Sequence, residues 1–152
     1  MPQLVPPVPV FYSYAPEDEK LRSRLVLHLR LLEREGWICQ RHDHFIPARI
    51  DSTCTAIQTF FDLPLIFLLI SPDFIASHRC YEVEMPYALQ RHRSNTARVI
   101  PIILRPCDWQ TAPFAELTCL PYGGKSVTEW SNRDRALSDI AQSLRSFLKI
   151  SS

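Results

Sequence analysis

The residues that decide the fold run from Pro64 to Phe74 and read PLIFLLISPDF. The uncharged run Pro64–Ile70 predicts a strand that is buried on both faces, as the strands of parallel sheets are. Ser71 and Pro72 then predict the start of a helix, because serine caps helix N-termini and proline fits the first helical position. Polar residues just beyond this strand are therefore expected at the sheet edge where open α/β sheets bind ligands.

Further strands are predicted at Val10–Tyr14, Trp37–Arg41 and Val99–Leu104, and a weak fifth edge strand near Ser126–Val127. Helical patterns separate these stretches. Strands that alternate with helices pair in parallel through right-handed crossovers. The sequence therefore predicts an α/β fold, a flavodoxin-like three-layer sandwich with a central parallel sheet of about five strands.

The helices are predicted from apolar residues that share one face. Leucines from Leu21 to Leu32 form such a face, and Gly36 is expected to end that helix. A short helix is expected at Ala56–Phe61. The last helix carries an apolar stripe from Leu137 to Leu148, and Ser131–Asp134 is spaced as a variant of the capping box that would start it.

Composition predicts one domain with no electrostatic preference for polyanions. The chain has 152 residues, 46% of them hydrophobic, which is enough to bury a core. Its 17 Lys and Arg residues balance 16 Asp and Glu residues, so the net charge of +1 favours neither nucleic acid nor a membrane surface as a partner. Prolines in residues 1–8 predict an extended lead-in, and no transmembrane or secretory segment is expected.

The five cysteines form no CxxC pair and are odd in number, which predicts reduced thiols in a cytoplasmic protein. Other chemistries find no support. With three glycines and no GxGxxG or phosphate-loop motif, no Gly-rich cradle for a cofactor's pyrophosphate is expected. His42 and His44 have no well-spaced third ligand, so no metal site is predicted. The third strand ends in Ile70-Ser71 and lacks the aspartate of a phosphoacceptor.

Several segments together resemble the bacterial form of the Toll/interleukin-1 receptor (TIR) domain. In that family a strand ends in Ser-Pro, as at Ser71-Pro72, and an acidic residue follows on the next helix. The other matching segments are Val10–Tyr14 for the first strand, Arg41–Asp43 and Ile46–Pro47 for the second strand and the long BB loop, Val99–Trp109 for the fourth strand, and Trp130–Asp134 before the last helix. The resemblance covers Pro9 to Leu148, so residues 9–149 are interpreted as the TIR domain and 150–152 as a tail that once continued into a longer protein.

The resemblance implies an enzyme that cleaves the bond between nicotinamide and ribose in NAD+. The product would be ADP-ribose or a cyclic isomer, with NAD+ as substrate and no cofactor. Glu84 is the implied catalytic residue. Glu82 and Glu84 point roughly 200° apart on a helix, so only one can face the site, and the match anchored on Ser71 selects Glu84. The structural alternative is that Glu84 only stabilises a helix N-terminus, where carboxylates are favoured.

By the same resemblance, five residues would bind substrate: Ser13, Tyr14, Asp43, Ile46 and Cys80. Ser13 and Tyr14 are equally compatible with simply finishing a strand, and Asp43 with capping a loop. The chain departs from the family in its BB loop, where Arg49 and Ser52 replace a glycine and an aromatic residue. Cys80 replaces a bulky residue. Pro86 predicts a helix that starts at about Val83 or is kinked there, because proline cannot donate to the carbonyl four residues back.

The implied role is in bacterial immune signalling or defence, with activation through self-association of TIR domains and a fused or partner sensor or effector domain. Two alternatives remain open. One is a TIR domain that signals by TIR–TIR association alone, without turnover. The other is an enzyme similar to nucleoside deoxyribosyltransferases, which share this type of fold and use a single essential glutamate.

Overall fold

Four parallel strands form the centre of the protein in the order β2-β1-β3-β4. The computed structural model describes residues 4–40 and 63–151. The strands are β1 (Val8–Ser13), β2 (Ile38–Cys39), β3 (Leu65–Ile70) and β4 (Arg98–Ile103). This order and the parallel pairing confirm the predicted α/β, flavodoxin-like sandwich, with four strands in the described sheet instead of about five.

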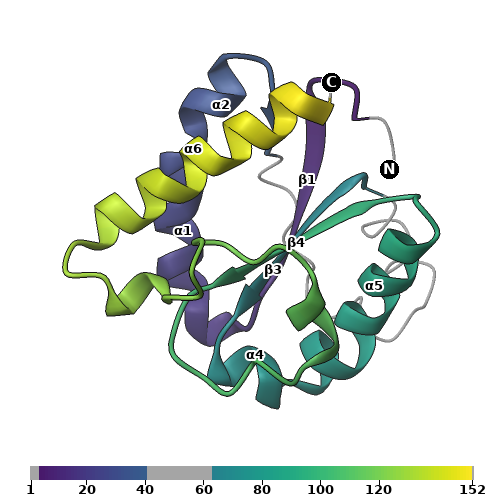
Figure 1. Ribbon diagram of the computed structural model, residues 1–152, viewed down its shortest axis with the longest axis vertical. Coiled ribbons are helices and arrows are strands. Elements are labelled where there is room, and N and C mark those ends of the chain that lie inside the picture. The colour runs from purple at the N-terminus through teal and green to yellow at the C-terminus, as the bar shows by residue number, and fades with distance from the viewer. Residues whose placement is uncertain (1–3, 41–62, 152) are drawn as a thin grey trace.

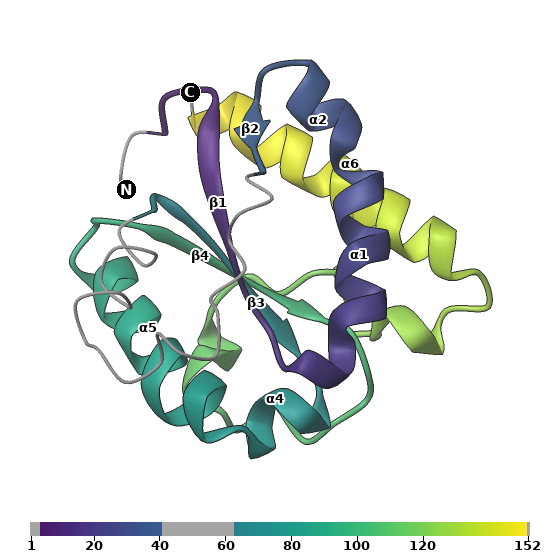
Figure 2. The same ribbon diagram turned by 180° about the vertical axis from the view of Figure 1, so that it is seen from behind.

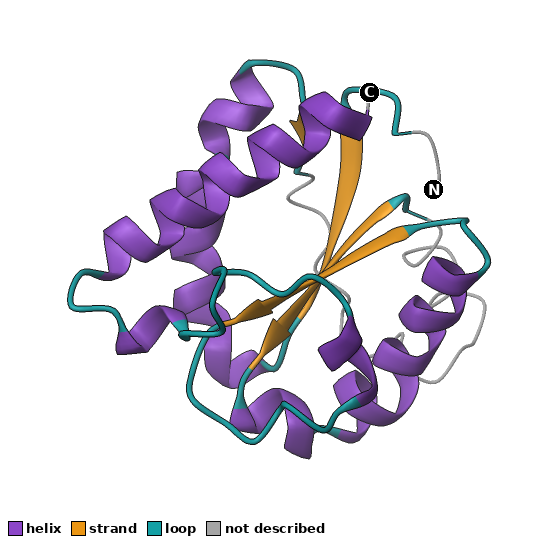
Figure 3. Cartoon of the chain, viewed as in Figure 1, coloured by secondary structure: helices purple, strands orange, loops and turns teal. Residues whose placement is uncertain are grey.

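Helices cover both faces of the sheet, as Figures 1 and 2 show from opposite sides. One layer contains α1, α2 and α6, and the other contains α4, η2 and α5; Figure 3 shows the strands between them. The bounds are η1 (Pro16–Asp18), α1 (Glu19–His28), α2 (Arg30–Arg34), α4 (Pro72–Ala76), the π-helix η2 (His78–Glu84), α5 (Met85–Arg93), η3 (Pro113–Glu116), η4 (Val127–Glu129) and α6 (Arg133–Ser151). Within the described residues, none of these helices is long and apolar enough to cross a membrane.

The strand β3 is the centre of the core, and all six of its residues are fully buried. Its side chains alternate between the two layers, because successive residues of a strand point to opposite faces. Leu65, Phe67 and Leu69 pack with α1, α2 and α6. Ile66, Leu68 and Ile70 pack with α4, η2 and α5. The continuous apolar run thus serves two cores at once, as the sequence predicted.

The helix predicted over the early leucines is broken once. It forms α1 and α2, which are separated by Leu29, whose backbone has a ψ of 0°. Gly36 ends the helix as predicted, at a positive φ of 84°. Its N–H donates to the Glu33 carbonyl and the N–H of Trp37 donates to the Leu32 carbonyl, the paired bonds of a Schellman motif.

The prediction of a fifth strand near Ser126–Val127 is wrong. Ser126 is the cap of the short helix η4, and a capping box joins its backbone and hydroxyl to Glu129. The spacing Ser-x-x-Glu is a helix-start pattern, and it outweighs the strand preference of Val127. On the side of β4 that faces away from β3, the described chain makes an isolated parallel bridge, between Ile102 and Leu120.

The start of α6 also differs from prediction. The cap is the side chain of Asn132, which accepts from the backbone N–H of Arg135 at 3.2 Å, and not Ser131. The apolar stripe is confirmed, with Leu137, Leu144 and Leu148 buried against the sheet. The short helix expected at Ala56–Phe61 lies outside the described residues.

The corrected cap gives a direct test. Asn132→Ala should lower the free energy of unfolding by about 1 kcal/mol, the usual cost of removing an N-cap side chain. Ser131→Ala is the matched control, because Ser131 is the neighbouring residue and is also exposed. This substitution should change the free energy of unfolding by at most about 0.5 kcal/mol. Urea denaturation measures both. A larger loss at Ser131 than at Asn132 would restore the cap expected from the sequence.

Candidate functional site

The neighbouring strands β1 and β3 define the place where a ligand site is expected. From β1 the chain runs through α1 and α2 to β2 on one side, and from β3 it runs through α4 and α5 to β4 on the other. The chain therefore diverges between these two strands, and the crevice beyond their carboxyl ends is where open α/β sheets bind ligands. Ser13 ends β1 and Ser71 directly follows β3, so both lie at this edge.

Strand alternation sends Ser13 toward the helix that carries the glutamates. Phe11 packs with the layer of α4, η2 and α5, and Ser13, two residues later, points the same way. The Ser13 hydroxyl donates to the Glu84 Oε1 at 2.6 Å. Tyr12 points to the opposite face, where its hydroxyl donates to Gln40. The predicted residues Ser13 and Glu84, 71 positions apart, thus form one buried pair.

Glu84 is a buried carboxyl with incomplete charge compensation. It is 1% exposed, and besides Ser13 it accepts from the Arg79 guanidinium at 3.4 Å. Burial raises the pKa of Glu84, while the positive charge of Arg79 and the Ser13 hydrogen bond act in the opposite direction. A buried carboxyl with a raised pKa at this edge of an α/β sheet is a typical feature of a functional site.

Glu82 and Glu84 separate as the helix geometry predicted. The side chain of Glu82 is 63% exposed and pairs with His78 on the surface. Glu84 faces the interior on the opposite side of the same helix. Of these two glutamates, only Glu84 therefore has the burial and the partners of a site residue.

The break predicted at Pro86 is a change of helix type. Residues His78–Glu84 form a π-helix, capped by the Ser77 side chain, and the N–H of Met85 donates to the Cys80 carbonyl, five residues back. Pro86 has no N–H with which to continue that series, and it falls in the first turn of α5, where a missing donor is harmless. Wide turns of this kind are frequent at functional sites.

Two more of the predicted residues, Tyr14 and Cys80, lie beside this pair. The Tyr14 carbonyl accepts from Arg79 at 3.1 Å, and burial raises the pKa of the Tyr14 hydroxyl to about 12. Cys80 is fully buried, and burial raises the pKa of its thiol to about 11, so the thiol stays protonated and is no nucleophile at neutral pH. Asp43, Ile46, Arg49 and Ser52 lie outside the described residues, as do His42 and His44.

A second buried carboxylate at the same edge was not predicted. Asp18 is 1% exposed, and it accepts from the Ser71 hydroxyl and, at 2.8 Å, from Arg105. Arg105 also pairs with Asp73 on α4. The Ser71 oxygen in turn caps α4 through the N–H of Phe74. This network fastens together the chain ends that follow β1, β3 and β4.

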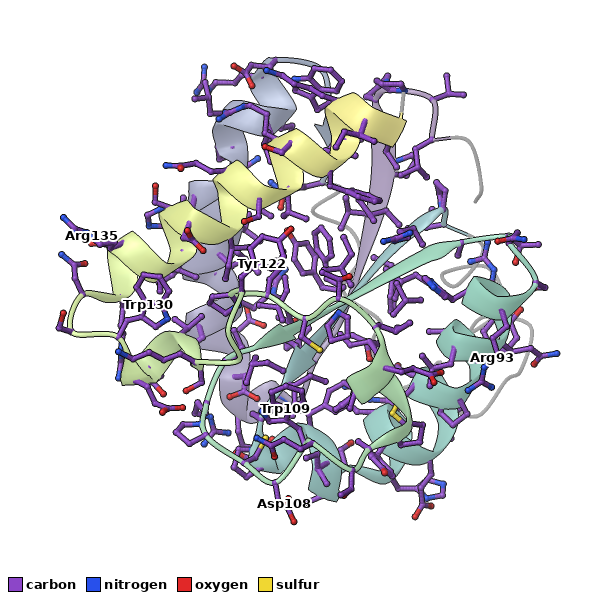
Figure 4. The ribbon with its side chains drawn as sticks, viewed as in Figure 1. Arg93, Asp108, Trp109, Tyr122, Trp130 and Arg135 are labelled. Atoms are coloured by element: carbon purple, nitrogen blue, oxygen red, sulfur yellow. The ribbon has the colours of Figure 1, made fainter. Side chains whose placement is uncertain are left out.

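Two hollows of the surface lie away from Glu84. One, of about 290 Å³, is lined by Tyr12, Arg22, Ser23, Val26, Leu27, Arg30 and Gln40. Another, of about 610 Å³, lies along α6 and includes Trp130 and Arg135, which Figure 4 shows at the outer end of that helix. Neither is lined by Glu84. Among the described residues, no group of three His, Cys, Asp or Glu side chains is placed to hold a metal ion.

Comparison with known proteins gives a relative without an assigned activity. No protein-family model matches the chain. Over 136 residues the chain is 44% identical to the "Uncharacterized protein y4lF" of Sinorhizobium fredii (strain NBRC 101917 / NGR234). The alignment covers 90% of this chain and 42% of that relative, so the chain spans less than half of the relative's length.

The raised pKa of Glu84 predicts how Glu84→Gln affects stability. In the unfolded chain this carboxyl titrates near 4.5, and in the folded protein it titrates higher, so stability is lost as pH rises from the first value through the second. Glutamine carries no charge and avoids this loss. The variant should therefore gain stability relative to the wild type as the pH rises above about 4.5, as urea denaturation over a pH series will measure.

Glu82→Gln is the control, because it removes an exposed glutamate from the same helix. Its stability difference from the wild type should stay nearly constant over the same pH range. A stability difference for Glu84→Gln that is equally flat, or that falls with rising pH, would contradict the burial of a poorly compensated charge.

The Asp18 network predicts that Arg105→Met destabilises the protein, because the buried Asp18 keeps Ser71 but loses its cationic partner. The loss should be about 1–3 kcal/mol, and Asp18→Asn in the same chain should recover part of it. Arg24→Met removes an exposed ion pair with Asp134 and should cost about 1 kcal/mol or less. If chemical denaturation shows the same loss of unfolding free energy for Arg105→Met and Arg24→Met, the Asp18 network does not stabilise the fold more than a surface ion pair does.

Proposed function

We propose that this domain cleaves the bond between nicotinamide and ribose in NAD+ and that Glu84 is the catalytic carboxylate. The observation that supports this most directly is the buried pair of Ser13 and Glu84 beyond the carboxyl ends of β1 and β3. The sequence resemblance to bacterial TIR domains supports the substrate, and Glu84 is the residue that the resemblance selects.

The reaction suits a single carboxylate. The leaving group is a pyridinium, so the electron pair of the breaking C–N bond neutralises the ring nitrogen and no general acid is required. Water adds to the ribose carbon and its proton passes to solvent, which gives nicotinamide, ADP-ribose and one proton. Glu84 stabilises the positive charge that develops on the ribose, and the Ser13 hydroxyl fixes the position of the carboxylate. In a cyclic product, a nucleophile of the substrate replaces water.

Regulation follows from how closed the site is. Glu84 is 1% exposed, so the carboxylate must be uncovered before it can meet a ribose. We therefore expect low activity in the isolated domain and activation through contacts between TIR domains or with another domain. The relative's greater length supports a further domain. We place the domain in the cytoplasm, where the free thiols of Cys39, Cys80, Cys107 and Cys119 would stay reduced, and in immune signalling.

The same closure favours the alternative of a domain that signals by association alone. In that case Glu84 would be a structural carboxyl that Ser13 and Arg79 hold in the core. The 3.4 Å contact with Arg79 argues against this, because a structural position is served better by a closely paired or an uncharged side chain. A transferase acting on nucleosides would use the same carboxylate and differs only in its acceptor.

Nicotinamide release from NAD+ by concentrated protein tests the proposal. Glu84→Gln should lower the rate by about 100-fold or more, as expected when one electrostatic stabiliser is lost. Glu82→Gln is the control and should stay within about twofold of the wild type, because Glu82 makes only a surface ion pair. Circular dichroism verifies that both variants fold.

Three outcomes count against the proposal. Activity that Glu84→Gln retains and Glu82→Gln loses would give the catalytic role to Glu82. No nicotinamide release at any protein concentration, with intact TIR–TIR association, would favour the association-only alternative. Release that occurs only when a nucleobase acceptor is added would favour the transferase.

A further inference from the structure

Arg79 and Arg105 occupy parallel positions at the carboxyl edge, and their surroundings differ. Each guanidinium contacts a buried carboxylate that also accepts from a serine at a strand end. Arg105 lies 2.8 Å from Asp18 and pairs with a second carboxylate, Asp73. Arg79 lies 3.4 Å from Glu84, and its other described partner is the neutral carbonyl of Tyr14. The charge of Arg105 is matched twice, whereas that of Arg79 is matched once and loosely.

Arg79 is also the more exposed member of its ion pair. Its side chain is 37% exposed, while that of Glu84 is 2% exposed. A charge-assisted hydrogen bond is normally about 2.7–2.9 Å long, so the 3.4 Å contact gives up little when it breaks. A guanidinium has five N–H donors in a planar fork, and the two described bonds leave donors for a ligand. Arg79 is therefore a cation at the site that can exchange partners.

We propose that Arg79 binds the pyrophosphate of the substrate and thereby frees Glu84, an inference that rests on the proposed function of this site. Arginine suits phosphate because its fork binds two oxygens at once. An anionic substrate that approaches Glu84 alone would be repelled by the carboxylate. With Arg79 between them, the phosphates gain a counter-charge, and Glu84 loses the cation that would otherwise weaken its effect on the developing ribosyl cation.

This arrangement specifies the substrate class. The site takes N-ribosyl pyridinium compounds that carry phosphate on the ribose, and it discriminates against the same ribosides without phosphate. NAD+ and nicotinamide riboside form a matched pair of probes, because the bond that breaks is identical and only the phosphates differ. The discrimination should reside in Arg79 and not in Glu84, which acts on the ribose that both compounds share.

The experiment compares kcat/KM for the two probes in the wild type, Arg79→Gln and Arg79→Lys. Arg79→Gln should lower the preference for NAD+ over nicotinamide riboside by about tenfold or more, the equivalent of one charge-assisted hydrogen bond. Arg79→Lys should fall between, because it keeps the charge and loses the fork. Arg93→Gln is the charge control: Arg93 is 64% exposed at the end of α5, at the edge of the molecule in Figure 4, and its loss should leave the preference unchanged.

Equal losses on both probes in Arg79→Gln would overturn the proposal, since Arg79 would then act only on Glu84 or on the fold. An unchanged preference would overturn it as well. A binding experiment separates this inference from the hydrolytic function. Calorimetry should show that ADP-ribose binds the Glu84→Gln variant. The double variant that also carries Arg79→Gln should bind ADP-ribose about tenfold or more weakly. If the wild type cleaves neither probe, this loss still supports the phosphate site, and equal binding by the two proteins refutes it.

Discussion

The burial of β3 on both faces is the constraint on which the rest of the structure depends. None of its six side chains reaches solvent, so each face of the sheet needs its own layer of helices. The chain supplies these layers through crossovers on opposite sides of β1 and β3. Parallel pairing then brings every strand's carboxyl end to one edge. The position of Ser13, Asp18, Ser71 and Arg105 follows from this arrangement of the core.

Two buried carboxylates at that edge have the same kinds of partner but differ in how tightly those partners are held. Asp18 and Glu84 each accept from a serine and from an arginine. Around Asp18 the bonds are short and the arginine is held by a second acid, so the group fastens three chain segments. Around Glu84 the ionic contact is long, and the pKa of the carboxyl is raised. The two carboxylates thus share the same kinds of partner and differ in how completely their charge is compensated.

The sequence predicted most of the fold because its main patterns are local. The apolar run of β3 and the glycine at position 36 each act through neighbouring residues, and both were interpreted correctly. The error at Ser126 is also local: the four residues from Ser126 to Glu129 carry the Ser-x-x-Glu pattern of a helix start, which conflicts with the predicted strand. Asn132, next to the expected cap, was missed because Ser131 and Asn132 are both good capping residues.

The candidate site was only half predictable. Glu84 was selected over Glu82 by helix geometry and resemblance, and Ser13 by resemblance, yet their contact spans 71 residues and no local pattern encodes it. Asp18 lies in the acidic run Glu17–Glu19, which is typical of a solvated helix start, and its partners are 53 and 87 residues away. Arg79 lies only five residues from Glu84, but its other bond, to the Tyr14 carbonyl, spans 65 residues and no local pattern encodes it. The composition of such a site is visible in the sequence, whereas its pairing requires the packed sheet.

The burial of Cys80 has a consequence for chemical labelling. Electrophiles such as maleimides react with thiolates. The Cys80 thiol is fully buried and has a pKa of about 11, so almost no Cys80 thiolate is present at neutral pH. Cys39 and Cys107 are partly exposed. A fluorophore attached at those positions would therefore leave the buried surroundings of Glu84 unmodified. Alkylation of Cys80 itself would report how often the π-helix beside Glu84 opens.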